Sequence, residues 1–280
     1  MRYRAYAKVN VSLEVLGKRP DGYHELATVM QTVSLCDELD VSADSTMRFT
    51  CSDPSLRDND NIVLRAADLL RETTNSPSGC RLVLHKAIPH AAGLGGGSSD
   101  AAATLRALND HWSLSFSRAE LADFGSRLGS DVPFFLHDGT ALVTGRGEFV
   151  APLPSPQRMW YALVKPPILV PTSAVFNLVS TQDWTDGAST RAVAGAICER
   201  GEVTLGVNGL QRALFELYPL ARECFEDVAR AAPGRAFVSG SGATVGALCS
   251  SRVEAEQVVA SVTREGWWSA VVRSVQREDT

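Results

Sequence analysis

The chain has 280 residues, with 27 Lys or Arg and 32 Asp or Glu, so its formal charge at neutral pH is −5. Hydrophobic residues make up 45% and charged residues 21%, which is typical of soluble globular proteins, and the length approaches the ~250–300 residues at which one core divides into two lobes. The mildly acidic composition without a Lys/Arg run argues against nucleic acid as a partner, and no apolar stretch approaches the roughly 18 residues that span a membrane.

The N-terminus resembles no signal peptide, because charged residues lead to Lys8 without an apolar segment. We therefore expect a cytoplasmic protein. The six cysteines are scattered without a Cys-x-x-Cys pair, which disfavours zinc and a disulfide framework. Reduced and mostly buried thiols are expected.

The first half of the chain is predicted to be rich in strands. Alternating apolar and polar residues indicate a strand over residues 3–15. Shorter strands are expected at 29–35, 39–43, 47–51 and 81–85, and helices at 60–71, behind an Asp or Asn cap, and at 118–128.

Three prolines within residues 151–156 predict a boundary between a domain of residues 1–155 and a domain of residues 156–280. Beyond it we expect helices at 172–179, 191–199, 210–217 and 253–264, strands at 161–164 and 269–274, and two strands flanking a Gly/Ser turn at 239–242. Interleaved helices and antiparallel strands give an α+β class.

A glycine-rich loop is the most informative segment. Gly93, Gly95, Gly96 and Gly97 allow positive φ angles and let backbone N–H groups converge on an anion. Ser98 and Ser99 are expected to cap the Ala-rich helix that follows, whose N-terminus also favours phosphate. The alternative is a plain flexible turn, but the abrupt change from glycines to helix formers favours an anion site.

Known phosphate motifs of other classes do not fit this loop. A P-loop requires Gly-Lys-Ser/Thr, which is absent, and a dinucleotide fingerprint requires glycine where Ser98 stands. The His-Arg-Asp and Asp-Phe-Gly motifs of protein kinases are also absent.

The loop at residues 89–102 instead resembles the phosphate motif of the GHMP kinase superfamily. Further segments agree in order and spacing over nearly the whole chain, at residues 7–10, 17–26, 129–135 and 239–244. Residues 19–24 and 129–135 resemble the branch that acts on 4-diphosphocytidyl-2-C-methyl-D-erythritol. The resemblance implies a two-lobe GHMP kinase fold, with an N-terminal lobe of the ribosomal S5 domain 2-like type, a C-terminal α/β lobe, and the site in the cleft between them.

The implied activity is ATP-dependent phosphorylation of the 2-hydroxyl of that substrate, in the non-mevalonate route to isoprenoid precursors. One alternative is another small-alcohol kinase of the superfamily, acting on mevalonate or homoserine; another is a non-catalytic nucleotide-binding sensor. The aromatic residues discussed below favour a cytidylated substrate, and the presence of both Lys8 and Asp131 weighs against the sensor.

Two residues are expected to carry the chemistry. On its sequence context alone, Asp131 fits a turn cap as well as a general base, and Lys8 fits an exposed strand position. The resemblance implies that Asp131 is the base and that Lys8 keeps it ionised and offsets transition-state charge. Asn10 lies two residues after Lys8, shares its face of the strand, and is expected to contact the substrate.

The resemblance also implies an ATP site. Its phosphates would lie on Pro89, His90, Ala91, Ala92, Gly93, Leu94, Gly95, Gly96, Gly97, Ser98 and Ser99. Asn61 and Lys86 would approach the adenosine, although a helix cap and a surface charge explain them equally well. Mg²⁺ is expected to arrive with ATP. Its protein ligands stay unassigned, and Asp100 is explained as a first-turn residue that favours the helix dipole.

Tyr23, His24 and Phe176 are expected to hold the cytosine ring, with Thr172 as a polar contact nearby. Arg146 and the pair Asn208-Gly209 depart from the pattern of the resembled kinases. Apart from the small-molecule substrate, we expect no nucleic-acid or membrane partner, and either a monomer or a homodimer.

Overall fold

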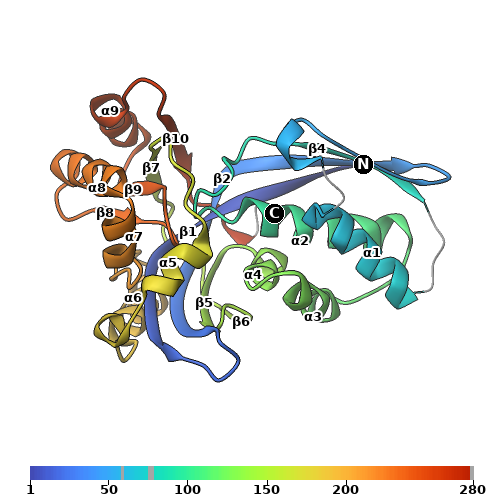
Figure 1. Ribbon diagram of the computed structural model, residues 1–280, viewed down its shortest axis with the longest axis horizontal. Coiled ribbons are helices and arrows are strands. Elements are labelled where there is room, and N and C mark those ends of the chain that lie inside the picture. Colours follow the sequence, from blue (N-terminus) through green and yellow to red (C-terminus); the bar gives the residue numbers. More distant parts are fainter. Residues whose placement is uncertain (58–59, 75–78, 278–280) are drawn as a thin grey trace. The chain divides into compact units, whose positions relative to one another are not determined.

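The computed structural model describes residues 1–57, 60–74 and 79–277, which form two compact units made of interleaved segments (Figure 1). The first unit comprises Met1–Ala7, Leu35–Pro89 and Gly95–His137. The second comprises Lys8–Ser34, His90–Leu94 and the chain from Asp138 onward. The domain boundary expected near residue 155 stays a prediction. Among the helices of these ranges, none has the length and apolar character needed to cross a membrane.

The first unit combines a small sheet with helices that pack on one another. Its elements are the C-terminal part of β2 (His24–Ala43), β3 (Met47–Cys51), β4 (Cys80–His85), α1 (Ile62–Thr74), α2 (Gly96–His111), α3 (Arg118–Leu128) and α4 (Val132–His137). In the sheet, β4 pairs antiparallel with β2 and parallel with β3. Helix α2 packs against α1, α3 and α4 (Figure 1), because its alanines at 101–103 present small, fully buried side chains.

The second unit holds two sets of antiparallel strands. In the first set, β1 (Arg2–Lys18) pairs with β2, β2 pairs with β5 (Thr140–Gly145), and β5 pairs with β6 (Phe149–Pro152). The second set is a sheet in the order β10 (Trp268–Arg273), β7 (Trp160–Lys165), β9 (Val245–Cys249) and β8 (Ala236–Val238).

The helices of the second unit are α5 (Thr172–Leu178), α6 (Ala188–Arg200), α7 (Gln211–Leu217), α8 (Pro219–Ala231) and α9 (Arg252–Val262). A buried core joins α8 and α9 to the second sheet, with Val228 and Val258 packed among Val164 and Val245. Short 3-10 helices lie at Pro54–Leu56 and Thr181–Asp183.

The α+β class is therefore observed, with two kinds of difference from the sequence-based expectations. Residues 29–35 and 39–43 belong to one continuous strand, β2, because residues 36–38 stay extended within it. Strands β5 and β6 and helices α4 and α8 were not expected; Pro219 begins α8, a position at which proline is compatible with a helix.

The prediction of reduced, mostly buried cysteines is confirmed. All six lie in the described ranges as free thiols, and four are buried, whereas Cys36 is half-buried and Cys198 is exposed. Burial raises the pKa of Cys80 to about 11 and that of Cys224 to about 12, so these thiols are poor nucleophiles.

Candidate active site

Lys8 and Asn10 point to one face of β1 and are both buried, as the alternation of a strand predicts. The Lys8 Nζ donates a hydrogen bond to Asn10 Oδ1 at 2.6 Å, and Asn10 Nδ2 donates to Thr28 Oγ1 at 2.8 Å. Thr28 in turn donates to the Ser12 carbonyl at 2.6 Å. This chain of hydrogen bonds fixes the ammonium group inside the second unit.

Three sequence motifs meet around Lys8 in that unit. The Lys8 backbone N–H donates to the Leu94 carbonyl at 3.0 Å, which ties β1 to the glycine loop. The hydroxyl of Ser239, in the C-terminal glycine motif, donates to the Gly93 carbonyl at 3.0 Å and accepts from the Asn10 N–H at 3.3 Å. A Cβ on Gly240 would lie only 3.4 Å from Lys8 Nζ. The Lys8 side chain therefore lies beside the backbone of both glycine motifs.

Gly93 is required by both conformation and space. Its φ is +73°, and a Cβ there would lie 2.1 Å from the Ser239 carbonyl oxygen. Gly234 has a similar φ of +72° but no heavy atom within 4 Å of a Cβ. We expect Gly234→Ala to lower the free energy of unfolding by about 1 kcal/mol from the left-handed backbone alone, and Gly93→Ala by at least ~2 kcal/mol more. Urea unfolding measures both, and equal losses would contradict the close approach at Gly93.

The second part of the glycine loop begins helix α2, in the first unit. Gly95 has φ +72° and precedes the first helical residue, Gly96. The prediction that Ser98 and Ser99 cap this helix is wrong, because the left-handed Gly95 starts it at Gly96 and both serines lie within the first turn. The Ser99 N–H donates to the Gly95 carbonyl at 2.9 Å. The N–H groups of residues 96–98 have no partner within the helix, which suits them to an anion.

Asp131 is half-buried in the turn between α3 and α4, also in the first unit. The Val132 N–H donates to the Gly129 carbonyl at 3.2 Å and closes that turn. A Cβ on Gly129 would lie 3.7 Å from Ser98 Oγ, so the turn lies beside the start of α2. The apolar side chains of α4 are buried behind it.

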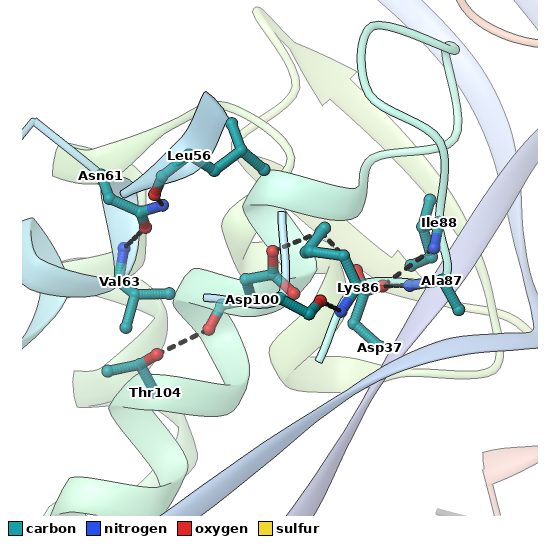
Figure 2. A network of polar contacts seen from close by, with 10 residues as sticks. Asp37, Leu56, Asn61, Val63, Lys86, Ala87, Ile88, Asp100 and Thr104 are labelled. Atoms are coloured by element: carbon teal, nitrogen blue, oxygen red, sulfur yellow. Dashed lines mark hydrogen bonds and ion pairs between the residues drawn. The ribbon is translucent and has the colours of Figure 1, made fainter. Parts of the chain in front are cut away.

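Lys86, Asp37 and Asp100 form a buried ionic network in the first unit (Figure 2). Lys86 Nζ lies 2.5 Å from Asp37 Oδ2 and 2.6 Å from Asp100 Oδ2. Lys86 is therefore not a surface charge, and Asp100 is not simply a residue that complements the helix dipole. Asp37 was not predicted to take part in a site, because in the sequence it is only an acidic residue between two predicted strands.

Burial raises the pKa of Asp100 to about 8, since it outweighs the stabilising charge of Lys86. Burial alone would lower the pKa of Lys86, but the charges of Asp100 and Asp37 outweigh it and raise that pKa. The Oδ1 atom of Asp100 is buried and has no hydrogen-bond partner among the described residues. One ammonium group thus faces two carboxyl groups.

This raised pKa predicts a pH-dependent stability. An unfolded Asp releases its proton near pH 3.8, whereas folded Asp100 keeps it to about pH 8. Its stabilising contribution is therefore full below the unfolded pKa and is lost as the pH rises toward 8. We expect the free energy of unfolding to fall more between about pH 5 and about pH 8 in the wild type than in Asp100→Asn. Urea titrations at both pH values test this, and identical falls would contradict it.

Asn61 caps helix α1 (Figure 2). Its Nδ2 donates to the Leu56 carbonyl at 2.7 Å, and its Oδ1 accepts from the Val63 N–H at 2.9 Å. The helix-cap interpretation is therefore observed. An amide has a second N–H and a second lone pair, so a contact with ATP stays a prediction.

His24 and Phe176 lie together in the second unit, with ring centroids 5.3 Å apart and ring planes 31° apart. Burial, and then the charge of Lys18, lower the pKa of His24, so its ring is neutral at pH 7. Nearby in sequence, the hydroxyl of Thr172 lies 3.0 Å from that of Ser241 in the C-terminal glycine motif. His24 and Phe176 therefore lie in direct contact, and their role in holding a cytosine ring stays a prediction.

Tyr23 is 51% exposed and lies in the turn before β2. The guanidinium carbon of Arg146 lies 5.0 Å from the centre of its ring. The two turns are adjacent because Leu26 of β2 pairs with Gly145 of β5. Arg146, which the sequence analysis noted only as a departure, therefore covers the Tyr23 ring.

Asn208 supports the C-terminal glycine motif. Its Nδ2 donates to the carbonyls of Val238 and Gly240, each at 2.9 Å, and its Oδ1 accepts from the Leu210 N–H at 2.8 Å. The departure at Gly209 leaves these contacts in place.

Comparison with known proteins identifies both parts of the chain. Residues 61–139 match the family described as GHMP kinases N terminal domain, and residues 193–267 match GHMP kinases C terminal. A relative named 4-diphosphocytidyl-2-C-methyl-D-erythritol kinase, from Brevibacillus brevis, is 40% identical over 91% of this chain and 89% of its own length. The protein of that name from Geobacillus kaustophilus is 41% identical over 86% of each chain.

Solved structures agree with these relatives. A crystal structure of 4-(cytidine 5'-diphospho)-2C-methyl-D-erythritol kinase matches with a TM-score of 0.81 and 33% identity, over 97% of this chain and 99% of that one. A homoserine kinase from Cytophaga hutchinsonii matches with a TM-score of 0.73 at 22% identity, over 99% of this chain and 94% of that one, and so shares the fold.

Proposed function

The chain belongs to the GHMP kinases and, within them, to the 4-diphosphocytidyl-2-C-methyl-D-erythritol kinase family, and we propose that the residues around Lys8 and Asp131 carry its reaction. The protein is a kinase that transfers a phosphoryl group from ATP to an alcohol. Its acceptor is the 2-hydroxyl of 4-diphosphocytidyl-2-C-methyl-D-erythritol, a step in the non-mevalonate route to isoprenoid precursors. The observation that carries the proposal is the buried Lys8 ammonium beside the two glycine motifs.

ATP binds with its phosphates along residues 89–99 in this proposal. The first-turn N–H groups of α2 and the backbone of the glycine loop supply donors, and the helix N-terminus favours the negative charge. Within the described ranges, no group of three or more His, Cys, Asp or Glu side chains is placed to hold a metal ion. An Mg²⁺ ion arriving with ATP would supply positive charge that offsets the charge on the transferred group.

Lys8 and Asp131 act on the reacting hydroxyl. Asp131 accepts the hydroxyl proton as the oxygen attacks the γ-phosphorus, and ADP leaves from the opposite side. Lys8 offers a fixed positive charge to the oxygens on which negative charge develops. Asn10 accepts a hydrogen bond from the ammonium and holds it in place.

The cytidine group binds at the aromatic residues of the second unit. The neutral ring of His24, packed on Phe176, can hydrogen bond the edge of the pyrimidine, and the exposed Tyr23 offers a stacking face. Thr172 adds a hydroxyl nearby.

Truncation of Tyr23 tests this assignment. We expect Tyr23→Ala to raise the KM for the cytidylated alcohol about tenfold, because a stacked aromatic contact is lost, and to leave the KM for ATP within about twofold. Steady-state kinetics with each substrate varied in turn measures both constants. A larger rise for ATP than for the alcohol would contradict the pyrimidine assignment.

Substrate choice is tested by turnover with three alcohols: the cytidylated methylerythritol, mevalonate and homoserine. Activity on the first alone is the expected result. Turnover of mevalonate or homoserine only would reject the proposed acceptor, and ATP binding with no turnover of any of them would favour a non-catalytic sensor.

A further inference from the structure

The buried side chain of Asp37 is linked by hydrogen bonds to both ends of the glycine loop, directly at one end and through Lys86 at the other (Figure 2). Before the loop, Asp37 Oδ1 accepts hydrogen bonds from the N–H groups of Ala87 and Ile88, at 2.5 and 2.8 Å. After the loop, Asp100 of α2 reaches Asp37 through Lys86, whose Nζ lies 2.5 Å from Asp37 and 2.6 Å from Asp100. A residue of β2 therefore links the strand side of the loop to the helix side.

The network lies directly against the start of α2. A Cβ on Gly96, the first helical residue, would lie 3.0 Å from Ile88 Cγ2 and 3.4 Å from Lys86 Nζ. The first turn of the helix is therefore packed on the residues that Asp37 holds. A displacement of Lys86 or Ile88 would therefore move the N–H groups of this turn directly, through the contacts with Gly96.

Stability alone is a weak reason for these residues. The side chain of Asp37 is fully buried, and those of Asp100 and Lys86 are 4% and 9% exposed. Burying ion pairs costs desolvation, and apolar residues of similar size are often as stable or more so. Here one cation faces two carboxyl groups and Asp100 Oδ1 has no hydrogen-bond partner in the described ranges, so the network is not even fully satisfied.

We propose that Asp37 is a positioning residue for ATP, acting through Lys86 and Asp100 to hold the first-turn N–H groups of α2 in the geometry that binds the phosphates. Glycine-rich backbone is flexible, and ordering it on binding reduces affinity. If both ends of the loop are already fixed before ATP binds, less conformational entropy is lost on binding. The inference rests on the proposed function, in which these N–H groups bind ATP, and it gives Lys86 a role other than contact with the adenosine.

The test compares two ligands in Asp37→Asn and Lys86→Met. Affinities for Mg²⁺-ATP and for Mg²⁺-tripolyphosphate, which has no adenosine, are measured by isothermal titration calorimetry. We expect both variants to bind both ligands at least about tenfold more weakly, since the loss of one hydrogen bond to a charged phosphate oxygen weakens binding by about that factor or more. The KM for the alcohol and kcat at saturating ATP should stay within about twofold of wild type, whereas lost folding would lower kcat and the binding stoichiometry.

Asp40→Asn is the matched control. Asp40 lies three residues further along β2 and makes an exposed ion pair with Arg2 at 2.8 Å, so the same substitution there should change neither affinity. The double variant of Asp37 and Lys86 should lose little more than either single variant, because the two act through one contact. If Asp37→Asn does not fold, Asp100→Asn is expected to weaken both ligands in the same way.

The outcomes separate this inference from the proposed function. If Lys86→Met weakens ATP but not tripolyphosphate while Asp37→Asn weakens neither, Lys86 contacts the adenosine and the positioning role is wrong. If the wild type binds both ligands and all variants bind them equally well, the inference alone fails. If the wild type binds neither ligand, the phosphate site of the proposed function is wrong, and the inference falls with it.

Discussion

Asp131→Asn is expected to lower kcat by about 10²–10⁴-fold, the usual contribution of a positioned general base, while ATP still binds with an affinity within about twofold of wild type. Asparagine has nearly the same shape as aspartate but cannot accept the hydroxyl proton. Because Asp131 is half-buried at the end of a short turn, the substitution should not disturb the buried face of α4. Single-turnover kinetics and ATP titration measure the two quantities.

The matched control for this substitution is Asp123→Asn. Asp123 is exposed on α3, in the same unit and eight residues earlier, so its variant should keep wild-type turnover. An Asp131→Asn protein with an unchanged rate would remove this residue as the base. A variant that loses ATP binding along with turnover would instead make Asp131 part of the nucleotide site.

Lys8→Met has the second large expected effect. We expect kcat to fall by about 10²–10³-fold, because a fixed positive charge is lost where the transition state gains negative charge. Lys8 is 3% exposed, and its removal takes a hydrogen-bond donor from the buried Asn10 Oδ1, so the free energy of unfolding should fall by about 1–3 kcal/mol. Slow turnover in a variant that is still folded at the assay temperature would separate catalysis from folding.

Lys165→Met controls for the loss of a buried lysine as such. Lys165 is also buried in the second unit, and its ammonium donates to the Ile168 carbonyl at 2.9 Å. We expect its kcat to stay within about twofold of wild type. Equal losses of turnover in the two variants would mean that Lys8 has no special place in the reaction.

Local patterns predicted the parts of this protein that depend on neighbouring residues. The period of two along β1 placed Lys8 and Asn10 on one face, and their buried hydrogen bond follows from it. The helix predicted at about 118–128 is observed over Arg118–Leu128, where Ser117 and Glu120 form a local capping box at its start. The residues themselves indicated an anion-binding loop at 93–97 and a turn at 239–242, whereas the second segment was assigned as a motif through the resemblance to GHMP kinases.

Contacts between distant residues were not predictable in the same way. The segment 36–38 reads as a polar break, yet Asp37 stays within β2 because its carboxylate is satisfied by residues 50 positions away. Lys86 reads as a surface charge for the same reason. The start of α2 was misplaced because capping preferences favour serine, whereas a left-handed Gly95 sets the helix start. In each case the deciding interaction is tertiary or rests on glycine's backbone freedom.

A crystal structure with a non-hydrolysable ATP analogue and the cytidylated alcohol tests the central claim most directly. We expect a carboxylate oxygen of Asp131 within about 3.2 Å of the 2-hydroxyl, and Lys8 Nζ within hydrogen-bonding distance of the reacting oxygens. A triphosphate bound away from residues 89–99, or an Asp131 carboxylate directed away from that hydroxyl, would contradict the account.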